Sequence, residues 1–200
     1  MVSVVNFNIG DPEELPIITD NTGTLLGLDS GSVGVGIFSL SDTDIGNANR
    51  NTLLSDFRQL GGADSELSLS NSFDANGLFD LNFQEDSAST SDLTDSPENI
   101  YVFIGDALTL ETSTLFAIVR ADALFAADEG GLEGQSTAQV FSDTSTVLVG
   151  SLQGAVTVPS ESGNLPFSSS LQLEFVPVPE PSSSALLGLG GLALILRRRR

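Results

Sequence analysis

Two apolar runs in the middle of the chain constrain its fold more than any other feature of the sequence. They span residues 99–105 and 114–120, and every residue from 100 to 104 is β-branched or aromatic. An alternating strand buries one face, whereas a continuous apolar run is typical of a central strand that is covered on both faces. We therefore expect these two runs to form the heart of a β-sheet.

Several shorter stretches alternate apolar with polar residues and predict further strands. The clearest lie at residues 5–9, 33–37, 67–69, 79–83 and 171–175. In the last stretch we expect Leu171, Leu173 and Phe175 to face the same way. Gly34 and Gly36 lie in the second stretch, where we expect a neighbouring chain to cross closely. Turn residues separate the strands about every 8 to 12 positions, so the predicted fold is mainly β, an antiparallel β-sandwich-like single domain.

Residues 51–60 predict one short amphipathic helix. Its apolar stripe has the spacing of one helical face and consists of Leu53, Leu54, Phe57 and Leu60. Asn51 is the expected N-cap, and Gly61 with Gly62 is the expected C-terminal stop. We expect the stripe to pack against the sheet.

The residue types that the chain lacks exclude several classes of site. It contains no His, Cys or Trp, which excludes disulfide bonds, thiolate nucleophiles, Ser-His-Asp triads and the usual zinc, copper and haem ligand sets. Carboxylate pairs and unusual Ser or Tyr chemistry remain open, but no local pattern marks either. We therefore expect neither enzymatic activity nor a cofactor.

Acidic residues dominate the charged positions. The chain has 27 Asp and Glu against 7 basic residues, all of them Arg, and its formal net charge is −20 at pH 7. Such a surface repels nucleic acid and anionic lipid. We expect no nucleic-acid partner, and the charge is sufficiently explained if it keeps the protein soluble.

One turn carries a weak calcium pattern. Asp74, Asn76 and Asp80 offer oxygen ligands as at the start of a calcium-binding loop, but the bidentate Glu and the third early carboxylate of such a loop are missing. Asn76-Gly77 between apolar runs is also a strong hairpin signal. We favour the turn over the metal site.

A group of polar residues lies in or next to the two central runs and consists of Tyr101, Arg120 and Asp122. An Arg beside an Asp and the chain's one Tyr could belong to a site. Most such pairs are structural, so we expect an ion pair between Arg120 and Asp122 at the edge of the core.

The tail from residue 176 onward has three parts in strict order. A Pro- and Ser-rich linker spans residues 176–184, an apolar run spans 185–196, and four arginines follow: Arg197, Arg198, Arg199 and Arg200. As a helix the apolar run would rise about 18 Å, well short of the roughly 30 Å hydrocarbon core of a membrane. We expect a short transmembrane segment that holds the chain transiently, with the arginines as a cytoplasmic stop. The alternatives are a simple tail anchor and a buried C-terminal helix.

A Pro-Glu-Pro triplet precedes the apolar run and consists of Pro179, Glu180 and Pro181. The order of triplet, apolar run and arginine cluster resembles the PEP-CTERM sorting signal of Gram-negative bacteria. The resemblance covers residues 176–200. It implies recognition and processing by an integral-membrane exosortase, and an association with exopolysaccharide or the biofilm matrix. It also implies export across the inner membrane, attachment to that membrane before processing, and a final location at the cell surface or in the extracellular matrix. It implies almost nothing about the activity of the residues upstream.

These expectations divide the chain into a β-rich exported domain (1–175), a Pro/Ser linker (176–184) and a short transmembrane segment with an Arg-rich end (185–200). The opening residues lack the basic region and the apolar run of a signal peptide. We therefore expect the true start to lie upstream of Met1, and the alternative is that the tail is vestigial. The expected function is that of an exported, non-catalytic surface or matrix protein, and the alternative is a carbohydrate- or calcium-dependent binding or adhesion module.

Overall fold

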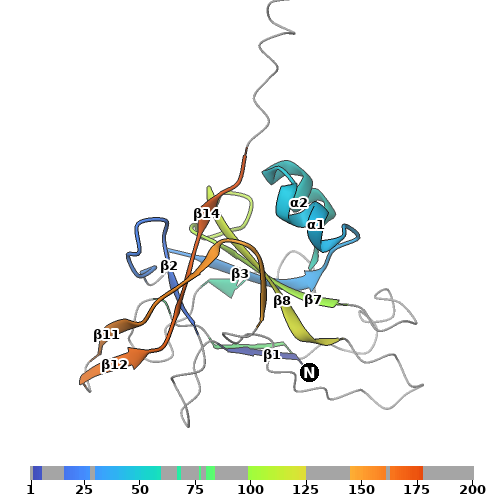
Figure 1. The fold of residues 1–200 in the computed structure, drawn as a ribbon. Helices are drawn as coiled ribbons and strands as arrows, with labels where there is room; N and C mark the ends of the chain where they lie inside the picture. The colour runs from blue at the N-terminus through green and yellow to red at the C-terminus, as the bar shows by residue number, and fades with distance from the viewer. Residues whose placement is uncertain are drawn as a thin grey trace, which may run out of the picture.

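A computed structural model of the chain describes residues 2–5, 16–27, 30–59, 67–68, 77, 80–83, 99–124, 145–160 and 163–177. Strands dominate this part of the chain and helices are few (Figure 1). The predicted mainly β class is therefore confirmed.

Among the residues that the structure describes, two short helices follow the third strand and all other elements are strands. The elements in chain order are β1 (Val2–Val5), β2 (Ile17–Thr19), β3 (Ser32–Ile37), α1 (Asp42–Asn47), α2 (Arg50–Asp56), β4 (Arg58–Gln59), β5 (Leu67–Ser68), β6 (Asp80–Phe83), β7 (Asn99–Gly105), β8 (Leu115–Leu124), β9 (Thr146–Val149), β10 (Ser151–Gln153), β11 (Val156–Ser160), β12 (Gly163–Phe167), β13 (Ser170–Gln172) and β14 (Glu174–Phe175).

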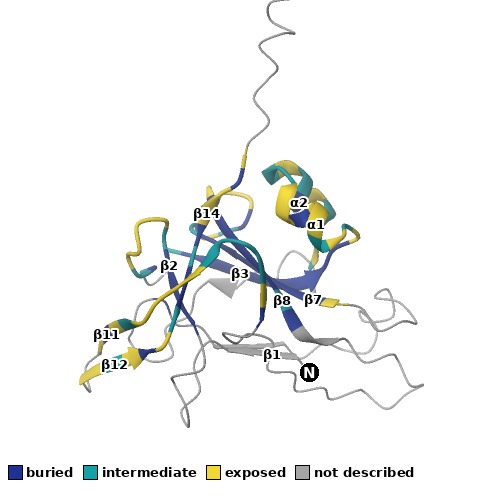
Figure 2. Cartoon of the chain, in the orientation of Figure 1, coloured by how far each residue is buried: buried dark blue, intermediate teal, exposed yellow. Residues whose placement is uncertain are grey.

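The largest sheet has seven strands and contains both of the long apolar runs. Its main path is β14-β8-β7-β3-β4, while β5 pairs with β3 and β9 pairs with β8. The two apolar runs are β7 and β8, which are antiparallel neighbours with Val102 opposite Val119. Every residue of β7 after Asn99 is buried (Figure 2). The prediction of two adjacent central strands is confirmed.

Alternate residues of β7 enter two different hydrophobic clusters, because successive side chains of a strand point to opposite faces of the sheet. Ile100, Val102 and Ile104 belong to a cluster shared with a smaller sheet. Tyr101 and Phe103 belong to a cluster that includes residues of α1 and α2. The seven-stranded sheet is therefore the middle layer, with the helices on one face and the smaller sheet on the other.

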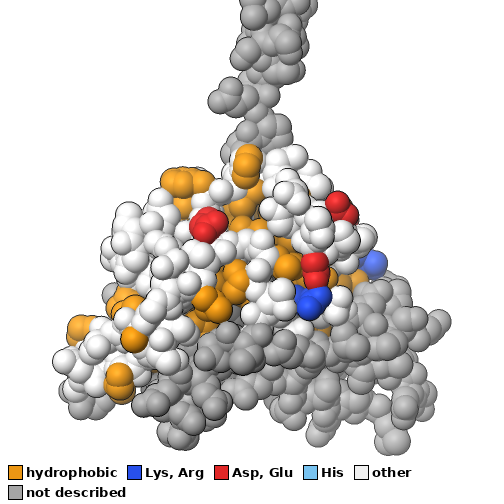
Figure 3. Space-filling model, viewed as in Figure 1, with side chains coloured by type: hydrophobic (Ala, Val, Ile, Leu, Met, Phe, Trp, Pro, Cys, Tyr) orange, Lys and Arg blue, Asp and Glu red, His pale blue; other side chains and the backbone are white. Residues whose placement is uncertain are grey.

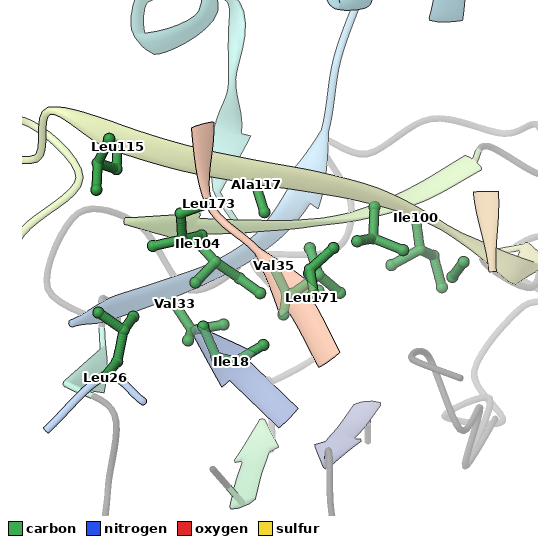
Figure 4. Packing of buried hydrophobic residues seen from close by; sticks show 13 residues of the cluster. Ile18, Leu26, Val33, Val35, Ile100, Ile104, Leu115, Ala117, Leu171 and Leu173 are labelled. Atoms are coloured by element: carbon green, nitrogen blue, oxygen red, sulfur yellow. The ribbon is translucent and has the colours of Figure 1, made fainter. Parts of the chain in front are cut away.

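The smaller sheet has the strand order β10-β13-β2. Figure 4 shows its side chains Ile18 and Leu171 packed close to Val33 and Ile104 of the large sheet. β13 runs parallel to β2, which corrects the expectation of a wholly antiparallel fold. The two strands lie far apart in the sequence, so no tight turn forces them to run in opposite directions.

The strand predicted at residues 171–175 is divided between the two sheets. β13 belongs to the small sheet and β14 to the edge of the large one, and the backbone N–H of Leu173 between them donates to the carbonyl of Thr19 at 3.0 Å. Leu171 and Leu173 are fully buried, but Phe175 is 69% exposed. Because the change of sheet interrupts the pleat, the prediction that Phe175 faces the same way as the two leucines is wrong.

The predicted helix is present as α2, but its bounds differ from those expected. Asn49 is the N-cap instead of Asn51, and its side-chain oxygen accepts from the backbone N–H of Thr52 at 3.0 Å. The helix ends at Asp56, before the two glycines, because Phe57 adopts an extended backbone that leads into β4. The expected packing of the stripe against the sheet is confirmed at Leu53, which is fully buried in the cluster around Phe103.

The sequence did not predict α1. This helix has six residues, its N-cap is Ser41, and Ile45 is its one buried residue. A helix of this length has too few turns to show an apolar stripe.

Gly36 lies where β4 crosses β3 closely. A Cβ at this position would stand 2.2 Å from the carbonyl oxygen of Arg58, and a Cβ at Gly34 would stand 3.0 Å from the ring of Phe57. The expected close crossing at these two glycines is therefore confirmed.

The hairpin predicted around Asn76-Gly77 is not formed by the described strands, because β5 pairs with β3 and β6 pairs with β1. Gly77 is a buried turn residue with φ of 78°. Its carbonyl accepts from the N–H of Ile18 at 3.1 Å, and its N–H donates to the carbonyl of Leu26 at 2.7 Å. Gly77 is thus tied by long-range hydrogen bonds to β2 and to Leu26.

Candidate functional site

The last four described residues, 174–177, form a segment that we call the junction. Its first two residues are β14, in which Phe175 lies opposite Leu115 at the start of β8. Val176 is 7% exposed and belongs to the cluster between the sheet and the helices. The carbonyl of Pro177 accepts a hydrogen bond from the backbone N–H of Arg50 at 3.2 Å. The junction is therefore bound to the sheet edge and to the start of α2 (Figure 1).

Arg50 connects the junction to the loop between β7 and β8. It is the first residue of α2, where a backbone N–H has no partner within the helix, so this N–H is available to Pro177. Its side chain donates from Nε to the carbonyl of Ser113 at 3.0 Å and from Nη2 to the carbonyl of Glu111. The guanidinium carbon also lies 5.9 Å from the ring centre of Phe116. One residue thus holds together α2, the β7–β8 loop and the junction.

Exposed apolar side chains lie at the same end of the structure. Phe175 of the junction and Leu108 of the β7–β8 loop are 69% and 59% exposed. Figure 3 shows hydrophobic side chains around the point at which the chain leaves the described surface. Large apolar side chains are therefore exposed to solvent at this end of the described structure.

The sequence that starts at the last residue of the junction matches a known protein-family model. Residues 177–200 match the family model of the PEP-CTERM protein-sorting motif. The chain carries a PEP-CTERM sorting motif. The match confirms the resemblance seen in the sequence. The first residue of the motif, Pro177, is exposed but hydrogen-bonded to Arg50 of the folded structure. Neither the comparison with curated proteins nor the comparison with solved structures gives a match.

The other predicted residues of the motif lie outside the described residues. These are Pro179, Glu180, Pro181, Arg197, Arg198, Arg199 and Arg200. The same holds for the apolar run from 185 to 196 that was expected to enter the membrane. In the ranges that the structure describes, neither helix is long and apolar enough to span a membrane.

Two of the three weak calcium candidates, Asp74 and Asn76, also lie outside the described residues. The third, Asp80, is the first residue of β6 and lies opposite Val5 of β1. Among the described side chains there is no group of three or more acidic residues placed to hold a metal ion. The calcium pattern therefore stays a prediction from the sequence.

Asp42 is the centre of a polar cluster that the sequence did not predict. Its Oδ1 accepts from the hydroxyl of Tyr101 at 3.0 Å, and its Oδ2 forms an ion pair with Nη1 of Arg120. Tyr101 and Arg120 are cross-strand neighbours on β7 and β8, and Asp42 is the first residue of α1. Asp42 is thus a partner of Arg120 that the sequence did not predict. The side chain of Asp122, the expected partner, lies outside the described part of the chain, so that pair stays a prediction. The sequence holds one signal of such a contact. Arginine is scarce ahead of the tail and acidic residues are many, so each arginine there has several carboxylates available as ion-pair partners.

The environment of Tyr101 opposes its ionisation. Burial raises the pKa of its hydroxyl above the ordinary value, and the hydrogen bond to Asp42 and the negative charge of Asp42 raise the pKa further. The folded chain therefore binds this proton more tightly than the unfolded chain does. The resulting stability is complete below the pKa of an unfolded tyrosine, about 10, and is lost as the pH rises through the higher pKa of the folded state.

We expect the ultraviolet titration of tyrosinate to have a higher midpoint in the native chain than in the chain unfolded in urea. The measurement reports Tyr101 alone, because the chain has a single Tyr. Asp42→Asn removes the charge and should lower the native midpoint toward the ordinary value. Equal midpoints for the native and unfolded wild-type chains would contradict the proposed environment.

A hollow of about 730 Å³ opens beside this cluster. Its lining includes Phe38, Ser41, Asp42, Arg58 and Asn99. Both oxygens of Asp42 are already bound within the protein, and Tyr101 is 3% exposed and presents no open ring. The hollow is thus polar, but its one carboxylate is occupied by structural contacts.

Other carboxylates also serve the local backbone. Asp56 accepts from the N–H groups of Ser39 and Leu40 at 2.8 and 3.0 Å. Asp106 accepts in the same way at the base of the β7–β8 loop, from the N–H groups of Thr114 and Leu115. These acidic side chains bind backbone N–H groups in loops and at the start of β8.

Asp20 shows the consequence of such bonding for ionisation. Burial by itself would raise the pKa of Asp20, but hydrogen bonds from Thr22, Thr24 and Gly23 together lower it below the ordinary value. The bonds from Thr22 and Thr24 to Oδ1 are 2.7 to 2.9 Å long. This carboxylate is thereby kept charged as the acceptor of a tight turn.

Proposed function

We propose that this chain is an exported, non-catalytic protein of the cell surface or extracellular matrix, delivered through its PEP-CTERM motif. The motif is the observation that carries the proposal. Motifs of this kind imply export and processing by an exosortase-type membrane enzyme. In this proposal the Gram-negative inner membrane holds the chain before processing, and the processed chain then joins the exopolysaccharide or biofilm matrix.

The proposal that the chain is non-catalytic is supported by how its described carboxylates are used. Asp20, Asp42, Asp56 and Asp106 all accept hydrogen bonds from nearby backbone or side-chain donors. A general acid or base needs access to a substrate proton, and a carboxylate committed to a turn or an ion pair offers little of it. We further propose that the two sheets facing each other across a shared core act as a sandwich-like scaffold that contributes bulk and negative charge.

A carbohydrate- or calcium-dependent binding module is the alternative. The polar hollow beside Asp42 could receive such a ligand. We do not favour this alternative, because sugar platforms usually rely on exposed Trp and Tyr rings. The one Tyr of the chain, Tyr101, is buried, and Trp is absent from the sequence. Calorimetric titration with calcium and a panel of polysaccharides tests it, since binding heat with any of them would favour the module.

Fractionation of cells tests the main proposal. An epitope tag at Gly154 suits this purpose, because Gly154 is exposed and a Cβ added there would have no heavy atom within 4 Å. We expect the tagged chain to become smaller and to leave the inner membrane in cells with an exosortase, and to stay full-length and attached in cells without one. A variant with alanines at Pro179, Glu180 and Pro181 should behave in exosortase-containing cells as the wild type does in cells lacking the enzyme. Unchanged size and location in both backgrounds would refute the proposal.

A further inference from the structure

The fold holds the chain up to the first residue of the sorting motif. The carbonyl of Pro177 is bound to Arg50, and Val176 is buried. Val178 is then the single residue between Pro177 and the Pro-Glu-Pro triplet that starts at Pro179. Consecutive Cα atoms are about 3.8 Å apart, so Pro179 lies within about 8 Å of a residue that is fixed to the folded surface.

A membrane enzyme that processes the motif has to bind the chain on both sides of the bond that it cleaves. Extended peptides are bound along several residues, through backbone hydrogen bonds and side-chain pockets on alternate positions. The junction cannot offer these groups while it is folded, since the carbonyl of Pro177 and the side chain of Val176 are already engaged.

We propose that the junction must detach from Arg50 and from the hydrophobic cluster before the motif is processed, and that Arg50 is the positioning residue that controls this step. The inference rests on the proposed processing by an exosortase. In the closed state the Arg50 N–H binds Pro177, and in the open state residues 174–177 are extended and available to the enzyme. The rate of processing then depends on the fraction of molecules in which the junction is open.

The structure allows the junction to open while the rest of the fold stays closed. β14 has two residues at the edge of the sheet, and both are exposed. Leu173, just before β14, is fully buried, and its N–H is hydrogen-bonded to the carbonyl of Thr19. The opening therefore does not extend past Leu173. Edge segments with few buried contacts are the ones that open at low free energy.

The side chain of Arg50 and its backbone N–H can be tested separately. Arg50→Ala removes the contacts with Ser113 and Glu111 and keeps the N–H that binds Pro177. Arg50→Pro removes the same side-chain contacts and the N–H as well. Proline suits the first position of a helix, and Asn49 before it already has the extended backbone, φ −82° and ψ 163°, that a residue preceding proline prefers. The two variants therefore differ mainly in the hydrogen bond to Pro177.

The experiment follows processing of the full chain by pulse labelling in cells that contain an exosortase. We expect Arg50→Pro to be processed about fivefold faster than Arg50→Ala, the effect of one backbone hydrogen bond. A third variant carries Gly-Ser-Gly-Ser between Val178 and Pro179, leaves every described residue unchanged, and should also be processed faster than the wild type. Urea unfolding of the purified chains verifies that each variant is folded.

Equal rates for the spacer variant and the wild type would overturn the inference, and so would equal rates for the two Arg50 variants. Slower processing of Arg50→Pro than of Arg50→Ala, with both folded, would show that the bound junction assists the enzyme, which also overturns it. A wild-type chain that is not processed at all would instead refute the proposed function. The two failures are therefore distinguishable.

Discussion

Phe103→Ala is expected to lower the free energy of unfolding by about 3–5 kcal/mol, the usual cost of removing a fully buried aromatic ring. Phe103 is 0% exposed and lies where the large sheet meets the helices. Its ring centre is 5.9, 5.2 and 5.3 Å from those of Phe38, Phe57 and Phe116. Alanine would leave a cavity among these rings, and the β-sheet backbone around it has little freedom to collapse inward.

Urea unfolding of the purified full-length chain in mild detergent measures this loss. Phe175→Ala is the matched control, because it makes the same chemical change at a side chain that is 69% exposed. We expect the control to change stability by less than about 0.5 kcal/mol. Similar losses for the two variants would show that Phe103 does not occupy the core position described above.

Gly36→Ala is expected to cost about 3 kcal/mol, at the upper end of the usual range for overpacking. The new Cβ would stand 2.2 Å from the carbonyl oxygen of Arg58 and 3.0 Å from the Cα of Gln59. These are backbone atoms, so no side-chain rotation can relieve the contact. β4 would have to move away from β3, and the end of α2 would move with it, because β4 follows α2 after the single residue Phe57.

Gly154→Ala is the control for the glycine substitution. A Cβ at Gly154 meets no atom within 4 Å, and the residue is exposed, so we expect a change of less than about 0.5 kcal/mol. Comparing the urea midpoints of the two alanine variants isolates the steric contact at Gly36. A Gly36→Ala chain as stable as its control would contradict the close crossing of β3 and β4.

The core of the sheet was predictable because its pattern is local. Within residues 99–105 and 114–120, every side chain from 100 to 104 and from 115 to 119 is apolar or aromatic, and only a strand covered on both faces buries all of these side chains. They became β7 and β8, side by side in the large sheet. The glycines of β3 were predictable for a similar reason, since a glycine within a strand indicates that another chain passes close by.

The errors arose where distant segments meet. Phe175 continues the alternation of Leu171 and Leu173, but the chain changes sheets at Leu173, and no local pattern reports such a change. The sequence also did not predict that Asp42 pairs with Arg120, because the two residues lie far apart along the chain and α1 brings Asp42 to β8. The helix boundary shifted because Phe57 adopts an extended backbone that leads into β4.

The sequence by itself determined the mainly β class, the two central strands and the sorting motif at residues 177–200. Each of these is encoded in neighbouring residues, by apolar periodicity or by a fixed order of residue types. The tertiary structure alone decided that Arg50 holds Pro177 and that Asp42 joins Tyr101 to Arg120. These contacts join residues between 59 and 127 positions apart, and such pairs form only after the sheets and helices have packed and placed their donors and acceptors within hydrogen-bond distance.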